Sequence, residues 1–389
     1  MTKETIFTIL IAVSVFGFLI LIHELGHFIS ARIFKVKINE FSIGMGPRLM
    51  YFDSKKSGTR YSVAIFPFGG FVAMEGENGE EESDSNKKDN LTDATLAIEV
   101  ENQSQPESKK TTPAPDPARF DQKPAWQRLI ITAAGAIVNI VAGFLIMTVV
   151  CTFGAMPSTT VKSFENKDGE LYKETMKLDI SVADSGIQPG DKIISIDGKR
   201  VKIYDELTYE IMRRGTEPVE VVIERGGERQ TLTVTFPTVE SQGTVCGTFD
   251  FTTENVKKDP ISIIRYSFRN SVMYIRVVWE SLFDLISGRY SFSALSGPVG
   301  ISSEIGAAAR LGIIPLLYMV VVISINLGVM NLLPVPALDG GRIITILIEI
   351  VTRKKIPAKV ERIINGVGLV ALLSLSAVVL VKDIIQLII

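Results

Sequence analysis

Four apolar stretches of bilayer length constrain this chain more than any other feature. They cover residues 6–28, 129–153, 313–333 and 363–381, and each is close to the ~20 residues that a helix needs to cross a membrane. Within lipid, a spanning segment must satisfy its own backbone polar groups, so each stretch is predicted to be a helix. We therefore expect a polytopic α-helical membrane protein with four transmembrane helices.

Polar residues stand out in the first three stretches, whereas the fourth is expected to be a plain anchor. Such side chains are costly in lipid and should face the protein interior or a water-filled space. They are His23, Glu24 and His27 in the first stretch, Asn139 in the second, and Asn326 and Asn331 in the third.

The two histidines of the chain belong to one HExxH motif, His23-Glu24-Leu25-Gly26-His27. Residues four apart share a helix face, so both imidazoles can bind one Zn²⁺, with Glu24 beside it as a general base. Motifs of this length also occur by chance on the solvated faces of soluble helices. The apolar setting of this one excludes a solvated face and favours a metal site at membrane depth.

A catalytic zinc site normally has three protein ligands and one open position. The chain has no third histidine and only two cysteines at unrelated positions, so a carboxylate is predicted to complete the site. Asp339 is the best candidate, because Pro334 and Pro336 must break the third helix just before it. Two alternatives stay open: Asp339 could cap a helix over residues 342–351, or Glu349 could be the ligand.

Basic residues cluster after the first stretch, before the second, and between the third and fourth. All three clusters fall on one side of the membrane, which the positive-inside rule makes cytoplasmic. We expect a multi-pass cell-membrane protein with its metal site near the cytoplasmic side and residues 154–311 outside the cell. The net charge of −2 and the absence of an aromatic-rich basic tract argue against a nucleic-acid partner.

Residues 38–74 are predicted to form an apolar β-hairpin beside the first helix. Such a hairpin is tolerable at membrane depth only if it is buried in protein or lines a cavity. Phe68-Gly69-Gly70-Phe71 indicates a close backbone approach. The run 61–66 is predicted to be an edge strand that could hold a substrate by strand addition, and its candidate substrate-binding residues are Tyr61, Val63 and Ile65.

Two further segments have distinct compositions. Residues 75–110 contain eleven acids against four bases and no aromatic residue. An insertion over 75–120 is therefore expected to be a disordered cytoplasmic spacer. Residues 257–310 place aromatic residues and arginines at helical spacing. They are predicted to be amphipathic or linker helices, which either lie at the membrane interface or pack under the external domain.

The external segment 160–240 contains a run, Ser181 to Lys199, that resembles the signature of bacterial PDZ domains. Asp197-Gly198 supplies a hairpin turn, a helix is predicted over 204–214, and strands are predicted over 219–224 and 230–236. A PDZ-like α+β domain would bind an extended peptide as an added strand. The alternative is a small domain of the same type with no ligand.

Taken together, these motifs resemble the bacterial site-2 protease family of intramembrane zinc metalloproteases, the regulator of sigma factor protease type in peptidase family M50. The resemblance covers nearly the whole chain and rests on the HExxH motif, the PDZ-like core, Ser296-Gly297-Pro298-Val299-Gly300-Ile301, and the segment from Asn326 through Leu338-Asp339-Gly340. It implies zinc at His23, His27 and Asp339, catalysis by Glu24, and substrate handling by Asn326, Asn331 and a membrane-re-entrant hairpin. The implied partners are single-span membrane proteins, either anti-sigma factor-like or remnant signal peptides.

The chain departs from the family pattern in two places. Ala136 stands where the family often has a proline in the second span, and one PDZ-like domain is found instead of two in tandem. The expected segments are a transmembrane helix over 1–32, the hairpin over 38–74, the insertion over 75–120, transmembrane helices over 127–153, 311–345 and 358–389, the PDZ-like domain over 160–240, and linker helices over 257–310.

Two other classes of function compete with proteolysis. A zinc-containing binding or quality-control protein would grip membrane segments without cutting them, but a complete motif with Glu24 argues against it. A metal transporter would need polar residues aligned across the bilayer, whereas those of this chain cluster at one depth.

Overall fold

The computed structural model describes residues 3–77, 116–241, 244–288 and 296–388. The chain divides into two compact units. Unit 1 comprises Met1–Ile9, Ile140–Val329 and Leu375–Ile389, and unit 2 comprises Leu10–Asn139 and Met330–Ser374.

Four helices in the described part of the chain are long and apolar enough to cross a membrane. They are α1 (Lys3–Ile33), α2 (Ala125–Phe153), α7 (Ile313–Asn331) and α9 (Ala358–Ile388), which confirms the four predicted stretches. In α9 only 6% of the most apolar window is buried. An apolar helix with so little protein around it is suited to a lipid environment.

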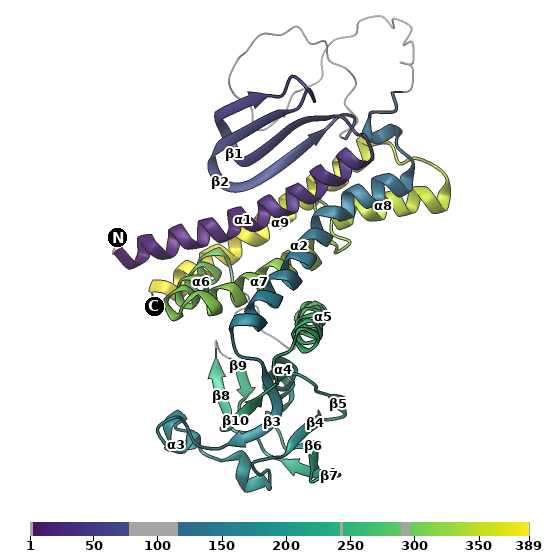
Figure 1. Ribbon diagram of the computed structural model, residues 1–389. Helices are drawn as coiled ribbons and strands as arrows, with labels where there is room; N and C mark the ends of the chain where they lie inside the picture. The colour runs from purple at the N-terminus through teal and green to yellow at the C-terminus, as the bar shows by residue number, and fades with distance from the viewer. Residues whose placement is uncertain (1–2, 78–115, 242–243, 289–295, 389) are drawn as a thin grey trace, which may run out of the picture. The chain divides into compact units, whose positions relative to one another are not determined.

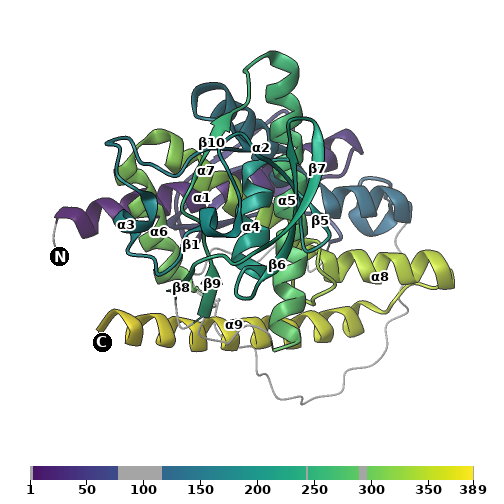
Figure 2. The same cartoon turned by 90° about the horizontal axis from the view of Figure 1, so that it is seen from below.

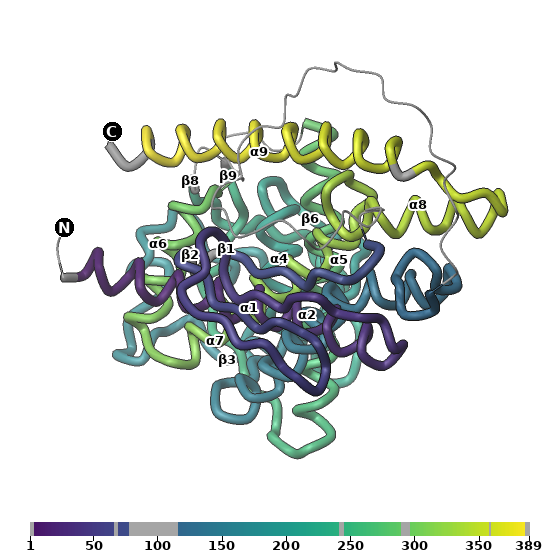
Figure 3. Tube along the Cα trace, turned by 90° about the horizontal axis from the view of Figure 1, so that it is seen from above, coloured from purple at the N-terminus to yellow at the C-terminus, as the bar shows by residue number. Residues whose placement is uncertain are grey.

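Unit 2 contains a two-stranded sheet of β1 (Ile38–Asp53) and β2 (Arg60–Met74), which lies along α1 (Figures 1 and 3). Its inner side chains pack on the last turns of α1 and the start of α2 in one apolar core. Buried members of this core are Ala31, Val36, Ile38, Phe41, Val72, Met74, Phe120 and Ile131. The sheet is therefore held against the helix that carries the HExxH motif.

Both strands of this sheet are long and bent, so that they pair with each other more than once. Residues 40–43 pair with residues 60–63 and also with residues 70–73, while residues 48–53 pair with residues 60–64. Residues 60–63 thus have backbone partners on both sides. The prediction that 61–66 forms an edge strand is wrong, because an alternating pattern does not reveal how a bent strand pairs. The free edges are residues 48–53 and 70–74.

The predicted insertion over 75–120 lies mostly outside the described residues, but its two ends are ordered. Glu75 N donates to Lys37 O over 3.0 Å, and Phe120 N donates to Glu75 O over 2.8 Å. Phe120, in the short helix η1 (Phe120–Gln122), is only 4% exposed. This aromatic anchor and the backbone bonds join both ends of the insertion to the hairpin.

Unit 1 contains a sheet in the order β10-β3-β4-β6-β7, with β5 paired to β4. The strands are β3 (Pro157–Ser163), β4 (Lys192–Ile196), β5 (Lys199–Arg200), β6 (Val219–Arg225), β7 (Glu228–Val234) and β10 (Thr252–Asn255). Because β10 pairs with β3, this domain continues beyond the expected boundary at residue 240. A separate hairpin is made by β8 (Thr238–Ser241) and β9 (Thr244–Gly247).

Helices α3 (Tyr172–Met176) and α4 (Tyr204–Arg214) and the short helix η2 (Val182–Ser185) complete the domain. The bounds of α4 confirm the predicted helix. Its buried Leu207 and Ile211 enter an apolar core with strand residues such as Ile193, Val221 and Ile223. The opposite side of α4 contacts α5 (Pro260–Ile286), which runs beside it in Figure 2.

A largely buried carboxylate joins α4, α5 and α7 within unit 1. Asn270 Nδ2 donates to Asp205 Oδ2 over 2.7 Å, Tyr266 OH donates to the same oxygen over 3.3 Å, and Tyr318 OH donates to Asp205 Oδ1. Burial raises the pKa of the Asp205 carboxyl above its ordinary value, although the three donors act in the opposite direction. Asp205 thus couples the sheet domain to a membrane-spanning helix.

The last helices of unit 1 are joined by a second carboxylate. Gly297 N and Gly300 N, at the start of α6 (Pro298–Leu311), donate to the two oxygens of Asp383 over 3.2 and 3.0 Å. Asp383 lies near the end of α9 and is 6% exposed. The helix expected to be a plain anchor therefore also binds the free amides at the N-terminus of α6.

Asp205→Ala should lower the stability of unit 1 by about 3 kcal/mol, because the donors on Asn270, Tyr266 and Tyr318 lose a buried acceptor. Thermal unfolding of the full chain in detergent measures this loss. Asp179→Ala is the matched control, since Asp179 is exposed and should leave the midpoint unchanged. Equal midpoints for the two variants would contradict the coupling role of Asp205.

Candidate metal centre

The HExxH motif lies within α1 and points both imidazoles into unit 2. His23 and His27 are each 9% exposed, and their Nε2 atoms lie 3.2 Å apart. Two nitrogens this close, on residues four apart, face the same point in space. The histidines are thus arranged as a pair of metal ligands.

A sharp turn after α7 brings Asp339 to the same point. Helix α7 ends at Asn331, and α8 (Asp339–Thr352) begins after a short turn that contains Pro334 and Pro336. A Cβ on Gly340 would lie 1.9 Å from Leu333 O, so only glycine allows the chain to fold back this tightly. The helix break predicted from the two prolines is confirmed.

The three candidate ligands have the spacing that zinc requires. Asp339 Oδ2 lies 3.2 Å from His23 Nε2 and 3.3 Å from His27 Nε2. Zinc bonds of about 2.0–2.1 Å separate neighbouring tetrahedral ligand atoms by about 3.3–3.4 Å. Asp339 Oδ2 is also buried and has no hydrogen bond within the described residues. Two imidazoles and one carboxylate oxygen therefore fit a zinc ion with an open fourth position.

Neither alternative for the third ligand agrees with the structure. The N-cap of α8 is Leu338, and no side chain caps that helix, so Asp339 is not a helix cap. Glu349 instead forms a largely buried ion pair with Arg128, at 2.6 Å between Oε1 and Nη2. Its carboxylate stabilises the contact between α8 and α2.

Helix α2 fixes the rings of both histidines from behind. His27 Nδ1 lies 2.9 Å from Ile131 O, and His23 Nδ1 lies 3.4 Å from the Asn139 amide. A neutral imidazole that binds metal through Nε2 carries its proton on Nδ1. Ile131 O can accept the proton of His27, and Asn139 can accept that of His23 when its amide is turned so that Oδ1 takes the place of Nδ2. The polar residue predicted to face the interior, Asn139, is fully buried.

Two glycines allow the helices to approach closely enough for this contact. A Cβ on Gly26 would lie 2.6 Å from Ala134 O, and a Cβ on Gly135 would lie 2.3 Å from His27 Nε2. The backbone of α2 therefore packs directly against the ligand face of α1. Small residues at membrane-helix contacts allow such proximity.

Glu24 lies beside the ligand pair and is covered by the hairpin. A Cβ on Gly70 would lie 3.1 Å from Glu24 Cγ, so the backbone of β2 passes directly over this side chain. The close approach predicted from the Gly69-Gly70 pair is confirmed. Gly70 is also at the start of the free edge formed by residues 70–74, which consequently begins next to Glu24.

An arginine on α8 ties the end of the hairpin to the helix that carries Asp339. Arg342 Nη2 donates to Glu77 O over 2.6 Å, and Arg342 Nη1 pairs with the Glu77 carboxylate. Its guanidinium carbon also lies 5.4 Å from the centre of the Phe120 ring. Glu77 follows β2 by three residues, so this clamp fixes the hairpin relative to α8.

The predicted substrate-binding residues lie in different parts of the structure. Asn331, the last residue of α7, belongs to unit 2 with the metal cluster, whereas Asn326 belongs to unit 1 and is exposed. Tyr61 contacts Arg32 through its hydroxyl, at 3.1 Å. Val63 and Ile65 are 43% and 47% exposed on the sheet.

Sequence reasoning missed Gly135, the Ile131 carbonyl and the Arg342 clamp. The run of small residues from Ala133 to Ala136 was a usable signal, because such runs mark close helix contacts. The contacts of the Ile131 carbonyl and of Arg342 depend on which segments are neighbours in space. No local sequence pattern reveals that.

Gly135→Ala should reduce zinc affinity about 10-fold or more, because the new methyl group occupies space next to His27 Nε2. Metal analysis of the purified full chain against a graded zinc chelator measures the change. Gly366→Ala is the control, since a Cβ there meets no atom within 4 Å. If both variants held zinc as tightly as the unmodified chain, the proposed ligand face would be wrong.

Comparison with known proteins shows the family of the chain. The model of peptidase family M50 matches residues 11–375. The regulator of sigma-W protease RasP of Bacillus subtilis is 29% identical over 97% of this chain and 98% of its own length. The zinc metalloprotease RasP of Bacillus licheniformis is also 29% identical, and a Clostridium perfringens protein is 33% identical. Both comparisons cover 97% of this chain and 98% of the relative. The chain therefore belongs to peptidase family M50, the site-2 protease family of zinc metalloproteases.

Proposed function

We propose that this chain is an intramembrane zinc metalloprotease that hydrolyses peptide bonds within the membrane segments of single-span proteins. The observation that carries the proposal is the convergence of His23, His27 and Asp339 around an apolar helix, with Glu24 beside them. Charged and polar side chains at membrane depth need a functional reason. Metal-assisted hydrolysis supplies one.

The ligand set assigns a role to each side chain. His23 Nε2, His27 Nε2 and Asp339 Oδ2 would hold the zinc, which when bound supplies Lewis acidity to the attacking water and to the scissile carbonyl. The Glu24 carboxylate accepts a proton from the attacking water and passes it to the leaving nitrogen. Ile131 O and Asn139 keep the two imidazoles in the orientation that presents Nε2.

The free edge of the hairpin offers a place for the substrate. A helical membrane segment must unwind before its peptide bonds can be attacked, and its freed backbone groups then need partners. Residues 70–74 can supply them by strand addition, starting beside Glu24. Tyr61, Val63 and Ile65 belong to the inner strand of the same sheet, and Asn326 and Asn331 are proposed to bond the unwound backbone from α7.

The arrangement in the membrane is also a proposal. The basic loops after α1, before α2 and after α8 favour the cytoplasmic side of the cell membrane for the metal centre and a re-entrant position for the hairpin. The sheet domain of unit 1 would then be extracytoplasmic. Its antiparallel order with α4 packed on one face supports a PDZ-like peptide-binding role.

The name of one relative supports a substrate class. The Bacillus subtilis protein is named a regulator of sigma-W protease, which supports membrane-bound anti-sigma factor-like substrates for this chain. Remnant signal peptides are a second expected class, since they too are short single spans. Both are single spans, whose backbone would pair with the edge at residues 70–74 once it is unwound.

Glu24→Gln should reduce cleavage about 10²–10⁴-fold while leaving bound zinc unchanged, because the amide cannot accept the proton from water. The assay uses the full chain in liposomes with a synthetic single-span peptide, and mass spectrometry reads the products. Asp339→Ala should instead lose both activity and zinc. Undiminished cleavage by Glu24→Gln would contradict the role of Glu24 as the general base and would favour another base.

Photocrosslinking tests the proposed edge. With p-benzoylphenylalanine at Phe71, the Glu24→Gln chain should crosslink to the bound peptide, because residue 71 is on the edge next to Glu24 and is 39% exposed. The same probe at Tyr51, on the opposite edge and 63% exposed, should give little product. A crosslink at residue 51 alone would show that the substrate binds the other edge.

A further inference from the structure

Helix α5 presents one face to the protein and leaves the other unpartnered. Its inner face is buried against α4 and α7 through residues such as Tyr266, Asn270 and Met273. The outer face carries a stripe of apolar side chains that are 47–84% exposed. They are Ile261, Ile264, Phe268, Val272, Trp279, Phe283 and Ile286.

Contacts within unit 1 place this outer face at the end of the membrane-spanning helices. The Phe268 ring lies 6.5 Å from the ring of Phe144 in α2, and Tyr274 OH contacts Tyr318 OH in α7. Before the helix begins, Lys258 Nζ donates to Thr152 O over 3.0 Å. The last turns of α2 and the first turns of α7 thus flank α5, which lies beside the ends of two helices that are long and apolar enough to span a membrane.

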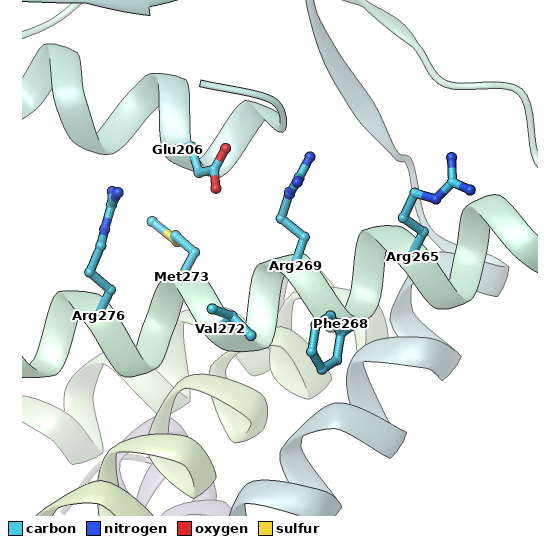
Figure 4. Close-up of a pocket in the computed structure, with 7 residues that line it drawn as sticks. All are labelled: Glu206, Arg265, Phe268, Arg269, Val272, Met273 and Arg276. Carbon is cyan, nitrogen blue, oxygen red and sulfur yellow. The ribbon is translucent and has the colours of Figure 1, made fainter. Parts of the chain in front are cut away.

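Arginines follow the edge of the apolar stripe. Arg265, Arg269 and Arg276 line a pocket of about 300 Å³ together with Glu206, Phe268, Val272 and Met273. Figure 4 shows their guanidinium groups on the side of α5 that faces α4, while Phe268 points the other way. Cations beside exposed apolar side chains are the arrangement of helices that lie in a membrane interface.

Two of these arginines are available for a ligand. Arg276 pairs with Glu210 at 2.8 Å, whereas neither Arg265 nor Arg269 has a carboxylate within 4.0 Å in the described part of the chain. Glu206, the acid in the pocket, accepts the Lys202 amide over 2.7 Å. The pocket therefore has an excess of positive charge beside an apolar surface.

We propose that Arg265 and Arg269 bind the phosphate of an anionic phospholipid, whose acyl chains lie along Phe268 and Val272. A lipid satisfies both halves of the site at once, because a soluble anion would leave the apolar stripe in water and a neutral lipid would leave the guanidinium pair without a counter-charge. The site lies on unit 1 and is separate from the metal centre, so the proposal does not depend on proteolysis.

Quenching of a tryptophan by brominated lipid tests the site. Phe268→Trp, made with Trp126→Phe and Trp279→Phe, puts the chain's single tryptophan on the apolar stripe, at a position between Arg265 and Arg269 in the sequence. The full chain is reconstituted in phosphatidylcholine nanodiscs that contain a fixed fraction of brominated phosphatidylglycerol or brominated phosphatidylcholine. We expect markedly stronger quenching by the brominated phosphatidylglycerol.

Charge variants decide whether the arginines are responsible. Arg265→Gln with Arg269→Gln should lower the apparent phosphatidylglycerol affinity about 30-fold, as two interfacial cations are lost. Arg265→Lys with Arg269→Lys should keep most of the preference. The matched control, Arg200→Gln with Arg229→Gln, removes the same charge from exposed strand positions and should change nothing.

Three outcomes would overturn the inference. They are equal quenching by the two brominated lipids, loss of the preference in the lysine variant, and displacement of the phosphatidylglycerol by inorganic phosphate. The last would identify a soluble-anion site.

Discussion

The metal centre depends on the close packing of α2 against α1. Gly26 and Gly135 remove the side chains that would hold the helices apart, so that the backbone of α2 reaches the imidazoles of His23 and His27. Both Nδ1 atoms then find partners on α2, and both Nε2 atoms are directed at Asp339. Without this contact the HExxH motif would be two histidines on a helix with no fixed orientation.

The second requirement is the break between α7 and α8. A continuous helix would carry Asp339 more than one turn past Asn331 and along the same axis. The turn lets it fold back, and Gly340 permits the close pass over Leu333. The ion pair of Arg128 with Glu349 then holds α8 against α2, so three segments far apart in sequence meet at one point.

Local chemistry decided how much of this could be predicted from sequence. Helix number, the convergence of His23, His27 and Asp339, and the approach of Gly70 could be predicted because each leaves a mark in its own segment: apolar length, four-residue spacing, a proline break or a glycine pair. The pairing of β2 was not predicted. Residues 60–63 and 70–73 both pair with residues 40–43, and the alternation of apolar and polar side chains does not tell which of the two segments lies at the edge of the sheet. The end of the sheet domain was misplaced for a similar reason, because β10 pairs with a strand about ninety residues earlier.

In helix α5, the two interpretations of one amphipathic pattern concern different faces of the same helix. An amphipathic pattern was expected to mean either packing under the external domain or contact with the membrane interface. The inner face does the first, through Asp205 and its partners on α5 and α7. The outer face has the composition for the second, with arginines at the margin of an exposed apolar stripe. With the outer face in the bilayer as proposed, α5 has two unlike surroundings, and its sequence must satisfy both.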